Sequence, residues 1–343
     1  MYGLSKFQLD RLVEEPKRWL ITGVAGFIGS HLLEALLKLQ QNVVGIDNFE
    51  NGYEENINEV LRNVSAKDAE KFQFVEADIC DFDEIISSFD GCHTVLHHAA
   101  LGSVPRSIDN PLRTNKVNVS GFLNVIEAAR RAKCSNFIYA ASSSTYGDSV
   151  VLPKVESEIG LPLSPYALTK LINEQYAEIY SRVFRLNSIG LRYFNIFGPR
   201  QSPNGAYAAV IPRWIDSVAN NSNIKIFGDG ETTRDFTYVE NVVQANLKAA
   251  LSVGLEGNNI FNVACGNTHS LNRLSSLIIK KADEAGHEFT GRVERLAPRP
   301  GDVTKSLASI KKADEVLGYR PSHQLGHGLD ELIAWYFKDN FDE

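Results

Sequence analysis

Short apolar runs and segments of helical period alternate along most of the chain. Leu32, Leu36 and Leu39 are spaced three or four residues apart and predict a helix after the first apolar run, and a longer helical segment covers 111–132. The runs that predict strands are 19–22, 43–47, 72–78, 94–100, 137–141 and 259–264. This alternation predicts an α/β fold with a Rossmann-type doubly wound parallel sheet and helices on both faces.

Three glycines interrupt the first apolar run and open the helix that follows it. Gly23 lets the chain turn, Gly26 lets backbone N–H groups approach a diphosphate, and Gly29 lets the helix pack close to the strand. Asp47 ends the second apolar run, where a dinucleotide fold places the carboxylate that binds the adenosine ribose. The pattern favours NAD over NADP, because a carboxylate would repel a 2′-phosphate. The glycines alone would also fit a tight turn without a ligand.

Small residues and potential metal ligands occur together in the run 94–100. Ala99 and Ala100 end a central strand and leave room for a cofactor against the backbone. Four potential metal ligands lie near them: Cys92, His93, His97 and His98. We predict no metal site here, because adjacent strand residues point to opposite faces and cannot converge on one ion.

Hydroxyl groups follow the strand at 137–141, and a tyrosine and a lysine come soon after them. Ser142 is the first of three consecutive serines, and Tyr166 and Lys170 are four residues apart on one helix face that begins at Pro165. A phenol has a pKa near ~10, and a neighbouring ammonium and a nicotinamide cation would both stabilise its phenolate. This arrangement predicts a general base, although a packed aromatic beside a surface charge would give the same spacing.

Composition limits the class of protein. The chain has 343 residues, of which 43% are hydrophobic and 22% charged, so we expect one two-part globular enzyme. A formal net charge of −7 without a basic block argues against nucleic acid or an anionic membrane as partner. No apolar run approaches ~18 residues, so we expect a cytoplasmic protein without a membrane segment. The scattered cysteines fit reduced thiols: Cys80, Cys92, Cys134 and Cys265.

The glycine triplet, the strand-end Ser142 and the Tyr166/Lys170 pair together resemble the extended short-chain dehydrogenase/reductase family. Five further segments resemble, more narrowly, the bacterial UDP-N-acetylglucosamine 4-epimerases of surface-polysaccharide (O-antigen) biosynthesis, over nearly the whole chain. These segments are 102–107, 142–147, 191–195, 204–212 and 299–303.

The resemblance implies binding residues for NAD and for a UDP-sugar. The expected NAD contacts are Gly23, Gly26, Phe27, Ile28, Gly29, Asp47, Asn48, Asp78, Ile79, Ala99, Ala100, Tyr166, Lys170 and Tyr193. The expected substrate contacts are Ser103, Ser142, Ser143, Asn195, Gln201, Ala209, Val210, Arg234, Arg299, Asp302 and Ser306. A guanidinium group suits a diphosphate, although Arg234 would also suit a surface ion pair with Asp235. Ser306 either gates the pocket, leaving room for a 2-acetamido group, or is a surface hydroxyl.

The resemblance also implies the reaction. We expect a 4-epimerase that interconverts UDP-GlcNAc and UDP-GalNAc by transient oxidation at C4 with bound NAD, with weaker action on UDP-Glc and UDP-Gal and the uronic acid forms left open. Tyr166 would take the proton of the C4 hydroxyl, and Ser142 would hydrogen-bond the same oxygen. The alternatives are a nucleotide-sugar 4,6-dehydratase and a non-catalytic NAD-binding protein. Dehydratases of the family carry Asp-Glu after the strand-end hydroxyl, where this chain has Ser143-Ser144.

The strand expected at 259–264 implies that the chain re-enters the nucleotide-binding part. We expect an NAD-binding domain over 1–194 and 237–266 and a smaller, discontinuous UDP-sugar domain over 195–236 and 267–343. Apolar positions in the helix from Pro111 and in the one after Tyr166 would pair two subunits in a homodimer, or would belong to the core. Those in the second helix are Leu171, Ile172, Tyr176, Ile179 and Tyr180.

Overall fold

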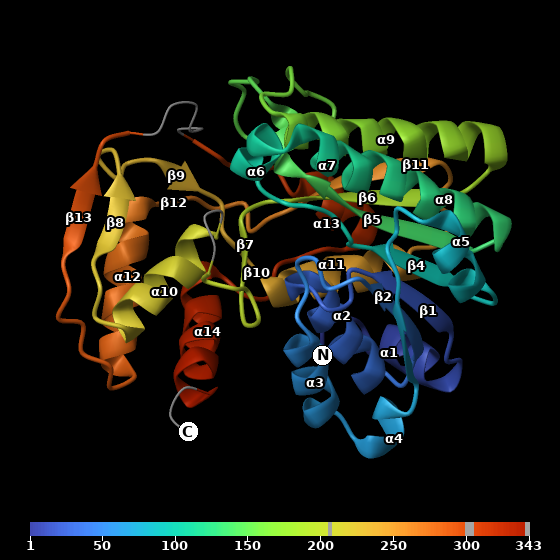
Figure 1. Cartoon of the computed structure of the whole chain (residues 1–343), viewed down its shortest axis with the longest axis horizontal. Helices are drawn as coiled ribbons and strands as arrows, with labels where there is room; N and C mark the ends of the chain where they lie inside the picture. Colours follow the sequence, from blue (N-terminus) through green and yellow to red (C-terminus); the bar gives the residue numbers. More distant parts are fainter. Residues whose placement is uncertain (205–207, 299–304, 340–343) are drawn as a thin grey trace.

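The computed structural model describes residues 1–204, 208–298 and 305–339 (Figure 1). Its largest sheet has seven strands in the order β11-β6-β5-β4-β1-β2-β3, all paired in parallel. They are β1 (Arg18–Thr22), β2 (Asn42–Asp47), β3 (Phe72–Glu76), β4 (Thr94–His97), β5 (Asn136–Ser142), β6 (Ser188–Tyr193) and β11 (Asn258–Val263). The predicted Rossmann-type sheet is therefore confirmed. The strands at 72 and 94 end sooner than expected, at Glu76 and His97, because the chain there leaves the sheet to line a groove.

Helices cover both faces of this sheet (Figure 1). One face carries α8 (Phe122–Arg131) and α9 (Pro165–Phe184), whose apolar residues form one core with α5 (Phe82–Ile85). The opposite face carries α2 (Phe27–Lys38) and α11 (Val239–Leu251), which contact each other and share a second core. The short α1 (Lys6–Glu14), α3 (Glu54–Asn63) and α4 (Ala66–Ala69) lie on the α2 side.

The long helix expected at 111–132 is present but is not uniform. It consists of α7 (Pro111–Asn115), a π-helical turn (Lys116–Gly121) and α8, and the short α6 (Val104–Asp109) precedes it. The wide turn ends at Gly121, where a Cβ would lie 2.7 Å from Ile79 Cδ1. Glycine therefore allows the close approach of this helix to the segment after β3.

A smaller layer lies beside the large sheet, on the left of Figure 1. The parallel pair β8 (Ile224–Phe227) and β13 (Val293–Leu296) packs with α10 (Val210–Ala219), α12 (Leu271–Glu284) and α14 (Leu325–Asp339) around a third core. Two short pairs connect the layers: β7 (Ile196–Phe197) with β10 (Thr237–Tyr238), and β9 (Thr233–Arg234) with β12 (His269–Ser270).

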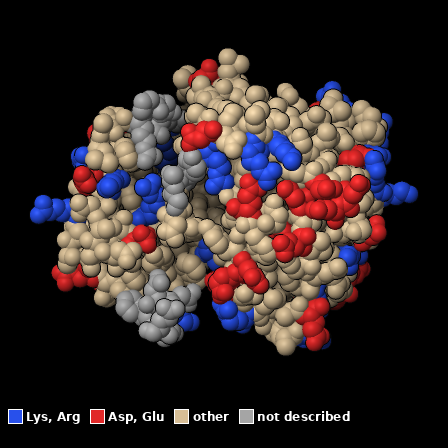
Figure 2. Space-filling view, in the orientation of Figure 1, with Lys and Arg blue, Asp and Glu red and all other residues tan. Residues whose placement is uncertain are grey.

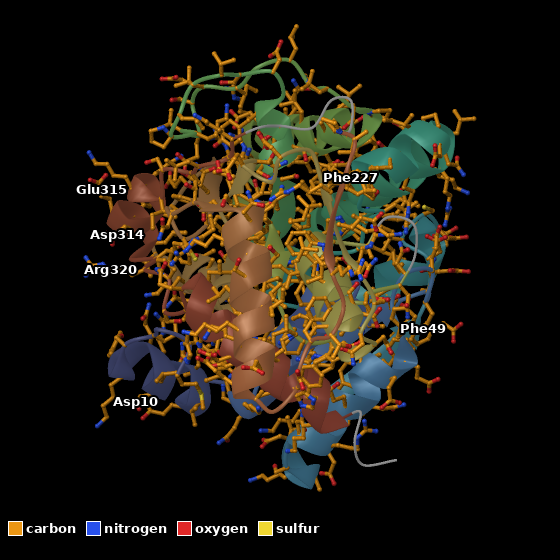
Figure 3. The ribbon with its side chains drawn as sticks, turned by 90° about the vertical axis from the view of Figure 1, so that its left-hand side faces the viewer. Asp10, Phe49, Phe227, Asp314, Glu315 and Arg320 are labelled. Atoms are coloured by element: carbon orange, nitrogen blue, oxygen red, sulfur yellow. The ribbon has the colours of Figure 1, made fainter. Side chains whose placement is uncertain are left out.

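The chain passes between the two layers more often than expected. β11 pairs with β6 at the edge of the large sheet, as predicted for the run at 259–264. However, α13 (Lys311–Leu317) also returns to this sheet, where it contacts β11 and α11, although the sequence placed everything after residue 267 with the smaller layer. Asp314 and Glu315 of α13 point outward in Figure 3, as does Arg320, which follows the helix.

The surface carries both signs of charge. In the face of Figure 2, acidic side chains gather over the half that contains the large sheet. Such a band repels a polyanion such as nucleic acid. Among the described helices, none is both long and apolar enough to cross a membrane.

Candidate active site

A groove lies at the carboxyl ends of β1, β2 and β4, where ligands bind in sheets of this type. Eight of the expected NAD contacts line it: Gly23, Gly26, Asp47, Asn48, Asp78, Ile79, Ala99 and Ala100. The other six expected NAD contacts lie outside that lining: Phe27, Ile28, Gly29, Tyr166, Lys170 and Tyr193. Phe27 packs against the core of the smaller layer, and the Tyr193 hydroxyl is within 2.8 Å of His98 Nε2 and accepts a bond from Asn246.

The three glycines of the turn between β1 and α2 differ in what surrounds them. Gly23 has φ +74°, and a Cβ there would lie 2.7 Å from Ala99 N. A Cβ on Gly29 would lie only 2.0 Å from Gly23 O, so this glycine lets α2 start against the turn. At Gly26 the nearest atom to a Cβ is the same oxygen at 3.1 Å, and the rest of its surroundings is open. Gly26 is thus a cradle next to a helix N-terminus, which fits a diphosphate.

Asp47 organises the loop beside the groove. Its Oδ2 accepts the N–H of Ala25 at 2.9 Å, and its Oδ1 accepts that of Phe49 at 2.9 Å. Burial raises the pKa of Asp47, and these backbone donors lower it. A carboxylate oxygen has two lone pairs, so the side chain can also accept from ribose hydroxyls.

Asp78 lies on the other side of the groove. Although burial raises the pKa of Asp78, the N–H of Cys80 and the guanidinium of Arg113 hold it below its usual value. Cys80 N donates to its Oδ1 at 2.8 Å, and Arg113 lies 3.5 Å away. The groove therefore has a fixed carboxylate at each of two strand ends.

Ser142, Tyr166 and Lys170 come together at the end of β5. Ser142 is the last residue of this strand, and α9 starts at Pro165 with its N-terminus capped by Ser164, whose oxygen accepts from Ala167 N at 3.1 Å. The hydroxyls of Tyr166 and Ser142 are hydrogen-bonded. Lys170, one helical turn later, donates from Nζ to Ala140 O in β5 at 2.8 Å.

Burial shifts the pKa values of both Tyr166 and Lys170 toward their uncharged forms. Burial raises the pKa of Tyr166, and the bond with Ser142 only partly offsets this. Burial lowers the pKa of Lys170 to about 8, against the influence of Glu174. Tyr166 is therefore protonated at neutral pH until positive charge stabilises its phenolate. Lys170 is a cation below pH 8 and supplies part of that charge.

A buried polar cluster supports the segment after Ser142. Arg192 and Glu174 form a bidentate ion pair at 2.9 and 2.8 Å, and the guanidinium lies 4.8 Å from the centre of the Tyr146 ring. The Tyr146 hydroxyl donates to Asn262 Oδ1 at 2.6 Å. These contacts hold the turn 143–146 against β6 and β11.

A second pocket, of about 270 Å³, lies in the smaller layer. Four expected substrate contacts line it: Asn195, Ala209, Val210 and Arg234. The sequence did not single out three further lining residues, Trp214, Lys225 and Phe227. From the sequence, a tryptophan in an apolar helix is expected in the core. Only the fold shows that Trp214 lines a pocket, where its ring can pack against a planar ring of a ligand.

The position of Asp235 excludes the surface ion pair with Arg234 that the sequence left open. Its side chain is fully buried and accepts from Cys265 N at 3.0 Å and Ala308 N at 3.4 Å, so a surface ion pair with Arg234 is wrong. Burial raises its pKa to about 6. Asp235 thus fixes the backbone that presents Arg234 to the pocket.

Among the described residues, the other expected substrate contacts lie outside the lining of this pocket. Ser306 N donates to Thr233 O at 3.1 Å, which places Ser306 beside β9 and next to Arg234. Arg299 and Asp302 lie outside the described residues. Ser103 caps α6 by accepting from Arg106 N, and Ser143 begins the turn after β5.

Known proteins resemble the chain along nearly its full length. A family model for the NAD dependent epimerase/dehydratase family matches residues 19–264. The chain belongs to this family. It is 37% identical to a putative UDP-glucose 4-epimerase of Methanocaldococcus jannaschii, covering 94% of this chain and 99% of that protein.

Two solved structures are similar as well. One is a UDP-N-acetylglucosamine 4-epimerase from Methanobrevibacter ruminantium in complex with UDP-N-acetylmuramic acid, with a TM-score of 0.86, 35% identity and coverage of 95% and 99%. The other is a UDP-glucose 4-epimerase from Thermotoga maritima with UDP-glucose, with a TM-score of 0.85, 34% identity and coverage of 94% and 99%. The predicted family, its cofactor NAD and the UDP-sugar 4-epimerase class are thereby confirmed.

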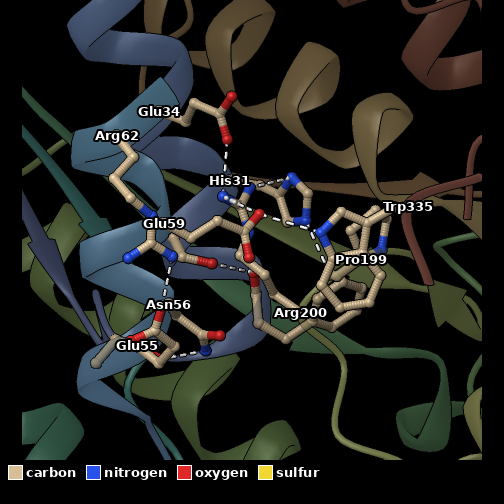
Figure 4. Close-up of polar contacts among 12 residues, drawn as sticks. His31, Glu34, Glu55, Asn56, Glu59, Arg62, Pro199, Arg200 and Trp335 are labelled. Carbon is tan, nitrogen blue, oxygen red and sulfur yellow. Dashed lines mark hydrogen bonds and ion pairs between the residues drawn. The ribbon is translucent and has the colours of Figure 1, made fainter. Parts of the chain in front are cut away.

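An ion-pair network outside the predicted site surrounds Arg200, the residue before Gln201 (Figure 4). Arg200 is buried with φ +62°, and its guanidinium donates to Glu34 at 2.7 Å and to His31 Nδ1 at 2.8 Å. Burial and Arg200 hold the pKa of His31 well below its usual value, so the neutral ring donates from Nε2 to Pro199 O at 3.0 Å. The network thus connects the segment 199–201 to α2, and the N-terminus of α2 borders the groove.

Gln201 and the three histidines near β4 each have a hydrogen-bond partner in the fold. Gln201 donates to Ile196 O at 3.2 Å, in the strand next to Asn195. His97 bonds Thr22, His98 bonds Tyr193 and His93 bonds Thr94, so these histidines point to different partners, as strand alternation predicts.

Proposed function

We propose that this chain is a UDP-N-acetylglucosamine 4-epimerase that interconverts UDP-GlcNAc and UDP-GalNAc. The observation that carries the proposal is the contact of Tyr166 with Ser142 beside Lys170, at the end of β5, the strand next to β4, whose end borders the glycine groove. A base, a hydroxyl donor and a cation are the groups that oxidation of a secondary alcohol needs.

The residues have separate roles in this mechanism. Tyr166 accepts the proton of the C4 hydroxyl, Ser142 hydrogen-bonds the same oxygen, and Lys170 stabilises the phenolate. NAD supplies a reversible two-electron oxidation of C4. Arg234 and Arg299 hold the diphosphate through paired N–H donors, while the pocket around Trp214 takes the uracil ring.

Inversion requires that the nucleotide stays bound while the sugar turns. The pocket in the smaller layer holds the UDP, and the 4-keto sugar rotates about its diphosphate link between two orientations. Tyr166 then returns its proton to the C4 oxygen, while C4 would take back, on its opposite face, the hydride that it gave to NAD. The stereocentre is inverted without net oxidation or reduction.

The choice of sugar rests on Ser306. The relatives differ in the sugar that their names give, so the class alone leaves this open. Ser306 is small and lies beside Arg234 through its bond to Thr233, which fits a pocket edge with room for a 2-acetamido group. Uronic acid forms remain a second substrate class to be assayed.

The test is incubation with UDP-GlcNAc followed by analysis of the sugar, with UDP-glucose in parallel. UDP-GalNAc as product supports the proposal, and a 4-keto-6-deoxy product would replace it by the dehydratase. Ser306→Tyr should lower kcat/KM on the acetylated sugars about 5- to 150-fold, the effect of ~1–3 kcal/mol of overpacking, and spare the plain sugars. Ser306→Ala, which keeps a small side chain, is the control. Equal losses on both sugar pairs would refute the role of Ser306.

We also propose that the enzyme acts as a homodimer. Leu112 of α7 is 84% exposed, and Ile179 and Val183 of α9 are 52% and 63% exposed on the neighbouring helix. Tyr180, in contrast, is buried in the core and belongs to no such surface. Four apolar helices, two from each copy, would cover these side chains. Sedimentation of the native chain and of Ile179→Glu tests this: a monomeric native chain would contradict it.

A further inference from the structure

Two histidines and a glutamate converge near the start of α14, outside the lining of the groove. His327 and Glu331 lie one turn apart in this helix, and His323 comes just before it. One ligand atom of each lies within 4.8 Å of the others. The Nε2 atoms of His323 and His327 are 3.2 and 3.3 Å from the same oxygen, Glu331 Oε1.

We propose that His323, His327 and Glu331, together with Glu240 of α11, form a binding site for a divalent transition-metal ion such as Zn²⁺. Metal–ligand bonds of ~2.0–2.2 Å in a tetrahedron place neighbouring ligand atoms about 3.3 Å apart. The two histidine–glutamate distances match such an edge. Imidazole nitrogen and carboxylate oxygen are also the donor types that zinc, nickel and cobalt accept.

A second carboxylate faces the cluster from another element. Glu240 Oε2 lies 3.7 Å from His323 Nε2, and Glu240 is in the first turn of α11. As metal ligands, the two carboxylates would contribute a charge of −2, which a divalent cation balances. The ion would therefore connect α14 of the smaller layer to α11 on the large sheet.

The surroundings of His323 direct its Nε2 toward the cluster. Ser322 Oγ donates to Asn241 Oδ1 at 3.4 Å and lies 2.8 Å from His323 Nδ1, so its lone pair can accept the Nδ1–H. Asn241 holds the backbone of His323 from both sides, since its Nδ2 donates to His323 O and its Oδ1 accepts from His323 N. An outer hydrogen bond of this kind is typical of metal-binding histidines.

The site has an entry path. His323 is nearly buried, whereas the side chains of His327 and Glu331 are 58% and 39% exposed. The His327 ring stacks on His323 with centroids 4.5 Å apart. Because the His327 ring is exposed, it can rotate, and this rotation would adjust the distance between the ligand nitrogens of the two histidines.

The experiment uses the full chain without an affinity tag, treated with a chelator and then dialysed. Co²⁺ is added as a spectroscopic probe, and Zn²⁺ is then used to displace it. We expect one Co²⁺ per chain, visible d–d bands of a four- or five-coordinate ion without a thiolate charge-transfer band, and a higher Tm with Zn²⁺ than with Mg²⁺.

Variants separate this site from adventitious binding. His327→Ala and Glu331→Gln should each weaken Co²⁺ binding by at least ~10-fold. His93→Gln, at a histidine bonded to Thr94, should bind like the native chain. Because His327 is exposed, its replacement should leave the Tm of the metal-free protein unchanged. A thiolate band, equal affinity in His327→Ala, or no saturable binding would overturn the proposal, and none of these outcomes bears on the epimerase reaction.

Discussion

Adding one methyl group at Gly26 should separate cofactor binding from folding. Gly26 has φ −77° and ψ 171°, a backbone conformation that alanine adopts easily. The added Cβ meets only Gly23 O, at 3.1 Å, so the turn must yield by a few tenths of an ångström. We therefore expect Gly26→Ala to fold with nearly the native Tm.

The same methyl group occupies the surface that a diphosphate would approach. Overpacking a close contact costs ~1–3 kcal/mol, so NAD should bind about 5- to 150-fold more weakly. The assay is a titration of cofactor-free protein with NAD, together with a thermal scan of the same sample.

Gly29→Ala is the matched control, because the same change there meets backbone. Its Cβ would lie 2.0 Å from Gly23 O and 2.9 Å from Val24 Cα, so α2 must shift and the Tm should fall. The reasoning is refuted if Gly26→Ala binds NAD as the native chain does, or if the two variants lose the same stability.

Three other predictions concern the chemistry, the ribose contact and the buried ion pair. Tyr166→Phe should lower turnover ~10²–10⁴-fold and keep NAD bound. Tyr176→Phe on the same helix should leave turnover unchanged, and sugar analysis measures the turnover of both variants. Asp47→Ala should weaken NAD binding and leave turnover at saturating NAD almost unchanged, which titration and kinetics would show; unaltered affinity would contradict it. Arg192→Met should destabilise the fold by ~3–5 kcal/mol in denaturant unfolding, against ~0–1 kcal/mol for Arg320→Met in an exposed ion pair, and similar losses would contradict it.

The sequence predicted the sheet because its signals are local, and the spacing of the candidate catalytic residues anticipated that the fold brings them together. Apolar runs indicate buried strands directly. Glycines at every third position after such a run are typical of the tight βα turn of a dinucleotide-binding fold. Tyr166 and Lys170 share a helix face by their spacing alone. Ser142 could be joined to them because the carboxyl ends of parallel strands meet at one edge.

Contacts between distant segments left no such signal. Arg200 meets Glu34 and His31 more than 160 residues earlier in the chain, and neither side of this network has a distinctive spacing. Trp214 belongs to an amphipathic helix in which core and pocket positions look alike. The return of α13 to the sheet was missed for the same reason, since its partners lie in β11 and α11.

The cluster at α14 is an intermediate case. His323, His327 and Glu331 follow one another at intervals of four, which is a local pattern that the sequence shows. Glu240 and Asn241, which complete and orient the cluster, come from α11 and could be placed only by the fold.

The placement of α11 has a consequence for how the protein is made. α11 covers the face of the sheet next to α2, and Val242 and Leu247 complete the core that contains Leu32 and Leu36. A ribosome synthesises the intervening segment of the smaller layer before α11 emerges. The nascent chain up to residue 194 therefore has an uncovered apolar face, which is a target for holding chaperones. Expressed alone, that fragment should aggregate, so the two layers must be produced as one chain.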